Sequence, residues 1–197
     1  MKVACIGDSL TEGLGVDKEN SWPMTLAKSG KTKVINRGIS GDTTTGMTSR
    51  FYHDVIAHQP THCIIMGGLN DLWWDTPLNS ILSNIYSMAK QAVHYKITPI
   101  IGIPTPIYIE GINYGTVWKP RAGYQILQHK LSEFIHLLKC MVEENKWHFI
   151  DFYSLYMDEN QYVNHRYFVK TDGIHPNEKG HQAMAHLALN LFENKLI

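Results

Sequence analysis

Short apolar runs rich in β-branched residues alternate along the chain with longer segments whose apolar residues recur every three or four positions. The short runs have the length and composition of buried strands, and the longer segments have the period of helices that bury one face. Such alternation is typical of β-α-β units with parallel strands. The sequence therefore predicts strands at residues 2–6, 33–36, 62–66, 97–103 and 148–152, and helices that include residues 78–93, 126–142 and 177–194.

Five parallel strands with helical connections predict an α/β fold, a three-layer α/β/α sandwich, in which right-handed crossovers are almost obligatory. We expect one domain over residues 1–197, since this length can bury one sizeable core and no linker, repeat or low-complexity segment interrupts it. Ligands of such sheets bind beyond the carboxyl ends of the strands. The residues that follow each strand are therefore the first candidates for chemistry.

The charges of the chain balance, with 18 basic and 18 acidic side chains and no net charge at pH 7. Nucleic acids and anionic membranes usually attract a clustered positive field, so a small molecule is the more suitable partner. No apolar run has the length of a membrane helix, and a turn signal at Gly7 comes before a signal peptide could be complete. We therefore expect a cytoplasmic protein without membrane insertion, which could form a homo-oligomer.

Cysteine usage agrees with this location. The chain has an odd number of cysteines, Cys5, Cys63 and Cys140, which lie far apart in the sequence and each belong to an apolar run. Buried reduced thiols are therefore expected, in place of a disulfide or a metal site.

A serine follows the first predicted strand, within the segment Gly-Asp-Ser-Leu at residues 7–10. A serine on a tight turn between a strand and a helix is exposed at the sheet edge, where backbone N–H groups point toward a bound oxyanion. Ser9 is therefore a candidate nucleophile, although a serine here could also simply cap a helix. Nucleotide binding has little support, because neither Gly-Lys-Ser/Thr nor Gly-x-Gly-x-x-Gly is present.

Two further candidates follow the second and third predicted strands. Gly41, within Ser-Gly-Asp at 40–42, could let its backbone N–H approach a substrate oxygen, or could simply permit a turn with positive φ. Asn70, within Gly-Leu-Asn-Asp at 68–71, carries a neutral amide donor that suits an oxyanion formed in the transition state. Its alternative role is that of an Asx-turn residue.

An acid and a histidine lie three residues apart near the end of the chain, within Asp-Gly-Ile-His-Pro at 172–176. One short loop can then aim the carboxylate of Asp172 at one imidazole nitrogen of His175 and leave the other nitrogen for Ser9. The alternative is a capping aspartate beside a surface histidine. This spacing makes Asp172 and His175 the candidate acid and base of a catalytic triad.

Together, these four blocks resemble those of the SGNH hydrolases, also called GDSL-type esterases and lipases, which are named for a Ser, Gly, Asn and His in separate blocks. All four occur here in the family's order, between residues 7 and 176, with no departure at a catalytic position. The resemblance implies the flavodoxin-like SGNH hydrolase fold and acyl transfer on small or medium carboxylic esters. It implies a small-molecule ester as substrate and no metal or other cofactor.

The resemblance also implies a role for each matched residue. Ser9 would be the nucleophile, His175 the general base and then acid, and Asp172 the residue that orients His175. The oxyanion hole would consist of the backbone N–H groups of Ser9 and Gly41 and the side-chain amide of Asn70.

Aromatic residues after the third and fourth predicted strands are the candidate substrate contacts. The loop at 104–118 should overhang the site, where it could form an acyl or aryl wall, a subunit contact or a cover over the core. Such walls favour small or medium esters but do not separate acyl, aryl, acetyl-sugar, thioester and lysophospholipid substrates. The candidates are Trp73, Trp74, Tyr108, Tyr114 and Trp118, together with Asp8 of the Gly-Asp-Ser-Leu segment.

Two other classes of protein are less well supported. A metal-dependent phosphoesterase could draw on Asp8, Asp42, Asp71, Asp172 and His175, but two-metal sites usually use several histidines together with carboxylates. A catalytically inactive carbohydrate- or ester-binding module would lack a nucleophile, base or acid. None of these residues is missing from the sequence, which therefore favours the esterase.

Overall fold

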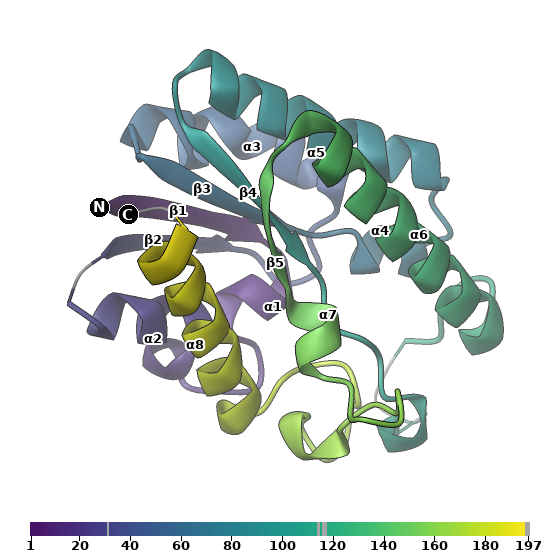
Figure 1. Ribbon diagram of the computed structural model, residues 1–197. Helices are drawn as coiled ribbons and strands as arrows, with labels where there is room; N and C mark the ends of the chain where they lie inside the picture. The colour runs from purple at the N-terminus through teal and green to yellow at the C-terminus, as the bar shows by residue number, and fades with distance from the viewer. Residues whose placement is uncertain (31, 114, 116–117, 196–197) are drawn as a thin grey trace.

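The structure, a computed structural model, describes residues 1–30, 32–113, 115 and 118–195. Its centre is a five-stranded parallel sheet with the strand order β2-β1-β3-β4-β5 (Figure 1). The strands are β1 (Lys2–Gly7), β2 (Lys33–Gly38), β3 (His62–Met66), β4 (Thr98–Ile103) and β5 (His148–Asp151). This is the flavodoxin-like order, and it confirms the predicted α/β fold with five parallel strands.

Helices cover both faces of the sheet (Figure 1). One face carries α3 (Thr44–Asp54), the short α4 (Leu69–Trp73), α5 (Leu78–His94) and α6 (Tyr124–Asn145). The other carries the short α1 (Ser9–Glu12), α2 (Trp22–Lys28), the short α7 (Phe152–Leu155) and α8 (Glu178–Lys195). Single 3₁₀ turns occur at η1 (Lys18–Asn20), η2 (Ile56–His58), η3 (Ile109–Gly111) and η4 (His165–Tyr167). Within the described residues, no helix has the length and apolar character needed to cross a membrane.

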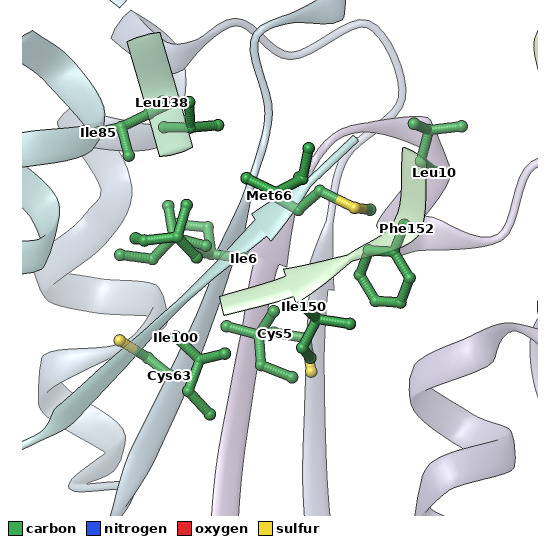
Figure 2. Packing of buried hydrophobic residues seen from close by; sticks show 14 of the residues in the cluster. Cys5, Ile6, Leu10, Cys63, Met66, Ile85, Ile100, Leu138, Ile150 and Phe152 are labelled. Atoms are coloured by element: carbon green, nitrogen blue, oxygen red, sulfur yellow. The ribbon is translucent and has the colours of Figure 1, made fainter. Parts of the chain in front are cut away.

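The core lies between the sheet and the two helix layers. The inner residues of the central strand β1, Val3 to Ile6, are fully buried, as a parallel sheet covered on both faces requires. Figure 2 shows Ile85 and Leu138 on the side where α5 and α6 cover the sheet, away from Phe152. These side chains are also fully or almost fully buried.

Several residues differ from the sequence-based expectation, and one of them is Ile97, which precedes β4 and is not its first residue. The three- and four-residue spacing of apolar positions predicts that Val93 and Ile126 lie on the apolar, buried faces of their helices, but they are 46% and 49% exposed. Each lies just outside the buried stripe, because successive helical residues turn by about 100°. Phe152 begins α7 and does not extend β5. The strand ends at Asp151 because its carboxylate accepts a hydrogen bond from the Ser154 N–H (3.0 Å) and so caps the helix.

The cysteines partly match the expectation. Cys5 and Cys63 are buried in β1 and β3, where burial raises the pKa of both thiols and keeps them protonated. Cys140 is free but partly exposed, because it lies on the outer flank of α6 between the buried Leu138 and Val142. The expectation of burial was therefore wrong for this cysteine.

The register of the central strands brings their carboxyl ends together. Gly7 of β1 lies opposite Gly38 of β2 and Met66 of β3. The segments that follow these three strands therefore leave the sheet side by side at one edge, where ligands of such sheets bind.

Candidate active site

Ser9 is placed at this edge by the turn from β1 into α1. The cap of α1 is Asp8, whose Oδ1 accepts a hydrogen bond from the Leu10 N–H (2.9 Å), and Ser9 is the first helical residue. The alternative in which Ser9 caps the helix is therefore wrong, because the residue before it, Asp8, is the cap. The Ser9 Oγ lies 3.0 Å from Nε2 of His175.

The loop before α8 folds around the carboxylate of Asp172. Its Oδ2 lies 2.8 Å from Nδ1 of His175, and its Oδ1 accepts hydrogen bonds from the backbone N–H groups of Ile174 (2.8 Å) and His175 (2.9 Å). Asp172 thus makes both the backbone contacts of a capping aspartate and the contact with His175 that an orienting carboxylate would need.

These contacts keep Asp172 ionised and fix the tautomer of neutral His175. Burial raises the pKa of Asp172, but the hydrogen bonds from His175 and Ile174 outweigh it and hold the pKa below its usual value. Asp172 is therefore a carboxylate at neutral pH, and Nδ1 of His175 must donate to it. In neutral His175, Nε2 is then left to accept the Ser9 hydroxyl proton.

The segment after β4 supports this loop from behind. The Tyr108 N–H donates to the Gly173 carbonyl (2.7 Å), and the Asn113 N–H donates to the Thr171 carbonyl (3.2 Å). Gly173 has φ +63°, and a Cβ there would lie 2.1 Å from the Tyr108 carbonyl oxygen. Only glycine allows this approach, so the segment and the loop fit as one unit.

Gly41 lies at the third position of a β-turn over residues 39–42, which the Asp42 N–H closes by donating to the Ile39 carbonyl (3.1 Å). Its φ of +80° is the value that a type II turn requires at this position. A Cβ at Gly41 would meet no atom within 4 Å, so conformation and not space favours glycine. Within the described chain, the N–H groups of Gly41 and Ser9 donate to no protein acceptor.

Asn70 lies within α4 and not in an Asx-turn. Its Nδ2 donates to the Asp42 carbonyl (2.8 Å), which fixes the plane of the amide and leaves its second N–H for another acceptor. Ser9, Gly41, Asn70 and His175 all line one pocket.

This pocket has a volume of about 320 Å³. Its lining residues are Asp8, Ser9, Leu10, Gly41, Leu69, Asn70, Trp73, Trp74, Ile107, Trp118, Ile174 and His175. Four of them, Leu10, Leu69, Ile107 and Ile174, were not identified from the sequence. Leu10, Leu69 and Ile174 directly adjoin Ser9, Asn70 and His175, and this adjacency was the available signal.

Three tryptophans form one wall of the pocket. The Trp73 Nε1 donates to the Trp118 carbonyl (2.8 Å), and the rings of Trp74 and Trp118 meet edge to face at 5.5 Å. Tyr108 does not line the pocket, because its ring packs against His165 and Phe168 beside the supporting segment. Tyr114, the remaining aromatic candidate, lies outside the described residues.

Asp8 is buried beside the nucleophile, with 1% of its surface exposed. Burial raises its pKa to about 7, against the lowering effect of the Leu10 N–H and of His175. Asp8 is therefore partly protonated at neutral pH.

Asp8→Asn should raise stability more at pH 8 than at pH 4.5. The pKa of Asp8 is about 7 in the folded chain and 3.8 ordinarily, so the folded state binds more protons between these values and loses stability as the pH rises. Asparagine keeps the cap without titrating, so the stability difference between Asp8→Asn and wild type should grow by about 3 kcal/mol from pH 4.5 to pH 8. Thermal unfolding at pH 4.5, 6 and 8 measures it, with the exposed Asp17→Asn as control. A pH-independent difference from wild type would contradict the prediction.

The other carboxylates considered for a metal site have protein partners. Asp42 accepts a hydrogen bond from Nε of Arg50 (2.8 Å), and Asp71 accepts two from the N–H (2.9 Å) and Oγ1 (2.7 Å) of Thr44. In the part of the chain that the structure describes, no three His, Cys, Asp or Glu residues form a group that could hold a metal ion.

The sequence matches the model of the GDSL-like Lipase/Acylhydrolase family over residues 5–183. The chain belongs to this family. An acetylxylan esterase from Geobacillus stearothermophilus is 26% identical over 163 residues, which cover 78% of this chain and 68% of that protein. An arylesterase from Vibrio mimicus is 36% identical over 92 residues, which cover 44% of this chain and 46% of that protein.

Solved structures of GDSL proteins share the fold. A G-D-S-L family protein from Desulfitobacterium hafniense DCB-2 superposes with a TM-score of 0.83 at 27% identity, covering 96% of this chain and 98% of that chain. The resemblance drawn from the four sequence blocks is thereby confirmed. The chain with Ser9 and His175, as a member of the GDSL family, is therefore an ester-hydrolysing enzyme.

Proposed function

We propose that this GDSL enzyme is a serine esterase in which Ser9 attacks the carbonyl carbon of a small or medium carboxylic ester. The observation that carries the proposal is the continuous contact from Ser9 Oγ to His175 Nε2 (3.0 Å) and from His175 Nδ1 to Asp172 Oδ2 (2.8 Å). A nucleophile within hydrogen-bond reach of a base, itself oriented by a third group, is the arrangement that activates a hydroxyl.

The reaction follows from these contacts. His175 Nε2 takes the Ser9 proton as Oγ bonds to the carbonyl carbon, and the negative charge moves to the carbonyl oxygen. This oxyanion accepts hydrogen bonds from the N–H groups of Ser9 and Gly41 and from the amide of Asn70. His175 then protonates the departing alcohol, and water repeats the two steps on the acyl-enzyme. The N–H groups of Ser9 and Gly41, which find no acceptor among the described residues, support this assignment.

The pocket wall supports a preference for compact apolar groups. Trp73, Trp74 and Trp118 offer aromatic surface, and about 320 Å³ is near the small end of ligand pockets, which span roughly 300–1,000 Å³. The relatives include an acetylxylan esterase and an arylesterase. Acetyl and other short-chain acyl esters, with aryl or sugar alcohols, are therefore the substrates that we propose first.

Covalent labelling and a substrate panel test this function. An alkyl fluorophosphonate should form one adduct per folded chain, located on the peptide that contains Ser9, and heat-unfolded protein should form none. p-Nitrophenyl acetate and butyrate should be hydrolysed faster than the decanoate. An adduct on another residue would contradict the assignment of Ser9.

Two further measurements, hydrolysis in the presence of EDTA and ester binding without turnover, separate the esterase from the two other classes of protein. Activity lost in EDTA and restored by Mn²⁺ would favour the metal-dependent phosphoesterase. Ester binding without turnover or labelling would favour an inactive binding module.

A further inference from the structure

Arg50 lies on α3, behind the proposed oxyanion hole. Its side chain is 16% exposed and does not line the pocket, so it does not touch the substrate. The guanidinium group nevertheless contacts three separate segments at the carboxyl edge of the sheet. Its Nε donates to the Asp42 carboxylate (2.8 Å), and its Nη2 donates to the Gly7 carbonyl (3.0 Å). Its Nη1 donates both to the Asp54 carboxylate (2.6 Å) and to the Arg37 carbonyl (2.9 Å).

Three of these contacts end beside a proposed oxyanion donor. Gly7 lies two residues before Ser9, and Arg37 lies in β2, which leads into the turn at 39–42. Asp42 directly follows Gly41, and its backbone carbonyl accepts the hydrogen bond from Asn70 Nδ2 (2.8 Å). One guanidinium group thus binds the segments that supply Ser9 and Gly41, and it reaches Asn70 indirectly, through the residue whose carbonyl Asn70 binds.

The opposite side of the turn has its own support. The carboxylate of Glu12 accepts hydrogen bonds from the N–H (2.8 Å) and the hydroxyl of Ser40, directly before Gly41. The turn is thus held before Gly41 by an anion and after it by a cation. Gly41 itself has no side chain to fix its position, so these neighbours determine where its N–H points.

The geometry calls for arginine in particular. A guanidinium presents five N–H donors in a rigid planar fork, whereas an ammonium is a compact point charge with three rotatable donors. Lysine at position 50 could neutralise Asp42, which is 12% exposed, but could not bind Asp42, Asp54 and the two carbonyls in this arrangement. Charge alone would therefore not preserve the positions of the three segments.

We propose that Arg50 is a positioning residue that sets the geometry of the oxyanion hole, an inference that rests on the proposed esterase mechanism. It acts through Asp42 on Gly41 and Asn70, and through the Gly7 carbonyl on the strand end that carries Ser9. Because the oxyanion forms during the reaction and is absent from the bound ester, the loss of this alignment should affect kcat and not KM.

Arg50→Lys tests the proposal. We expect kcat to fall by about 10²-fold, the size of effect that a misplacement of about 1 Å produces, with KM within about twofold of wild type. Affinity for an alkyl trifluoromethyl ketone, which forms a tetrahedral oxyanion adduct on Ser9, should weaken by a similar factor. The pH dependence of kcat/KM should not shift, because Arg50 contacts neither Asp172 nor His175.

Matched variants separate positioning from general destabilisation. Lys139→Gln removes an ion pair of comparable length, with Asp151 (2.6 Å), away from the oxyanion segments and should leave ketone affinity unchanged. Asn70→Ala should lower kcat by about 10²- to 10³-fold. The double variant Arg50→Lys/Asn70→Ala should lose less than the product of the two single losses, because both changes impair one oxyanion hole. Multiplicative losses, or a change confined to KM, would overturn the proposal.

A second variant covers the case in which Arg50→Lys does not fold. Asp42→Ala removes the carboxylate that Arg50 holds but keeps the backbone carbonyl that binds Asn70, and it should weaken ketone affinity in the same direction. Wild-type ketone affinity in Asp42→Ala would overturn the positioning role. Failure of the proposed function is distinguishable, because Ser9 would then resist labelling in the wild-type protein and Asn70→Ala would have no effect on kcat.

Discussion

Ser9→Ala should lower kcat for ester hydrolysis by about 10⁶-fold, the loss that removal of the nucleophile causes in other serine hydrolases. The variant keeps Asp8 as the cap of α1, so the fold should survive. KM, where it reports binding, should change little because the pocket wall is intact. Stopped assays at high enzyme concentration measure the residual rate, and thermal unfolding verifies the fold.

A matched serine controls for contaminating hydrolases. Ser49→Ala, on α3, removes a hydroxyl whose one partner among the described residues is the Gly46 carbonyl (2.7 Å), and it should retain wild-type activity after the same purification. Residual activity in Ser9→Ala within about tenfold of wild type would contradict the role of Ser9, since a nucleophile that can be removed at so small a loss does not form the acyl-enzyme.

The sequence was sufficient for the strands and for the residues that follow them. A buried parallel strand must be apolar on both faces, so residues 2–6 and 62–66 could be recognised from composition alone. The carboxyl ends of parallel strands meet at one edge, which explains why Ser9, Gly41 and Asn70 line one pocket although they are distant in sequence.

Contacts between distant segments could not be predicted in the same way. Trp73 and Trp118 lie 45 residues apart, and Arg50 and the Gly7 carbonyl lie 43 residues apart. No local period indicates which carbonyl a given donor will reach, because this depends on how the loops are placed in three dimensions. The same limit explains why the sequence offers Tyr108 as a candidate substrate contact, whereas its ring packs against His165 and Phe168 and its backbone supports the loop at 171–175.

Asp172→Asn should lower kcat by up to about 10⁴-fold with little loss of stability. The asparagine oxygen can still accept the N–H groups of Ile174 and His175, so the loop keeps its shape. The amide nitrogen then replaces Oδ2 and donates to Nδ1 of His175. Neutral His175 must carry its proton on Nε2, where it can no longer accept the proton of Ser9.

The tautomer of His175 distinguishes this mechanism from simple loss of structure. ¹⁵N chemical shifts of the imidazole should report a proton on Nδ1 in the wild-type enzyme and on Nε2 in Asp172→Asn. Asp172→Ala provides the contrast, because it removes both the orienting contact and the two backbone caps and should lower Tm as well as kcat. Full activity in Asp172→Asn, or an unchanged tautomer together with reduced activity, would show that the carboxylate does not act by orienting His175.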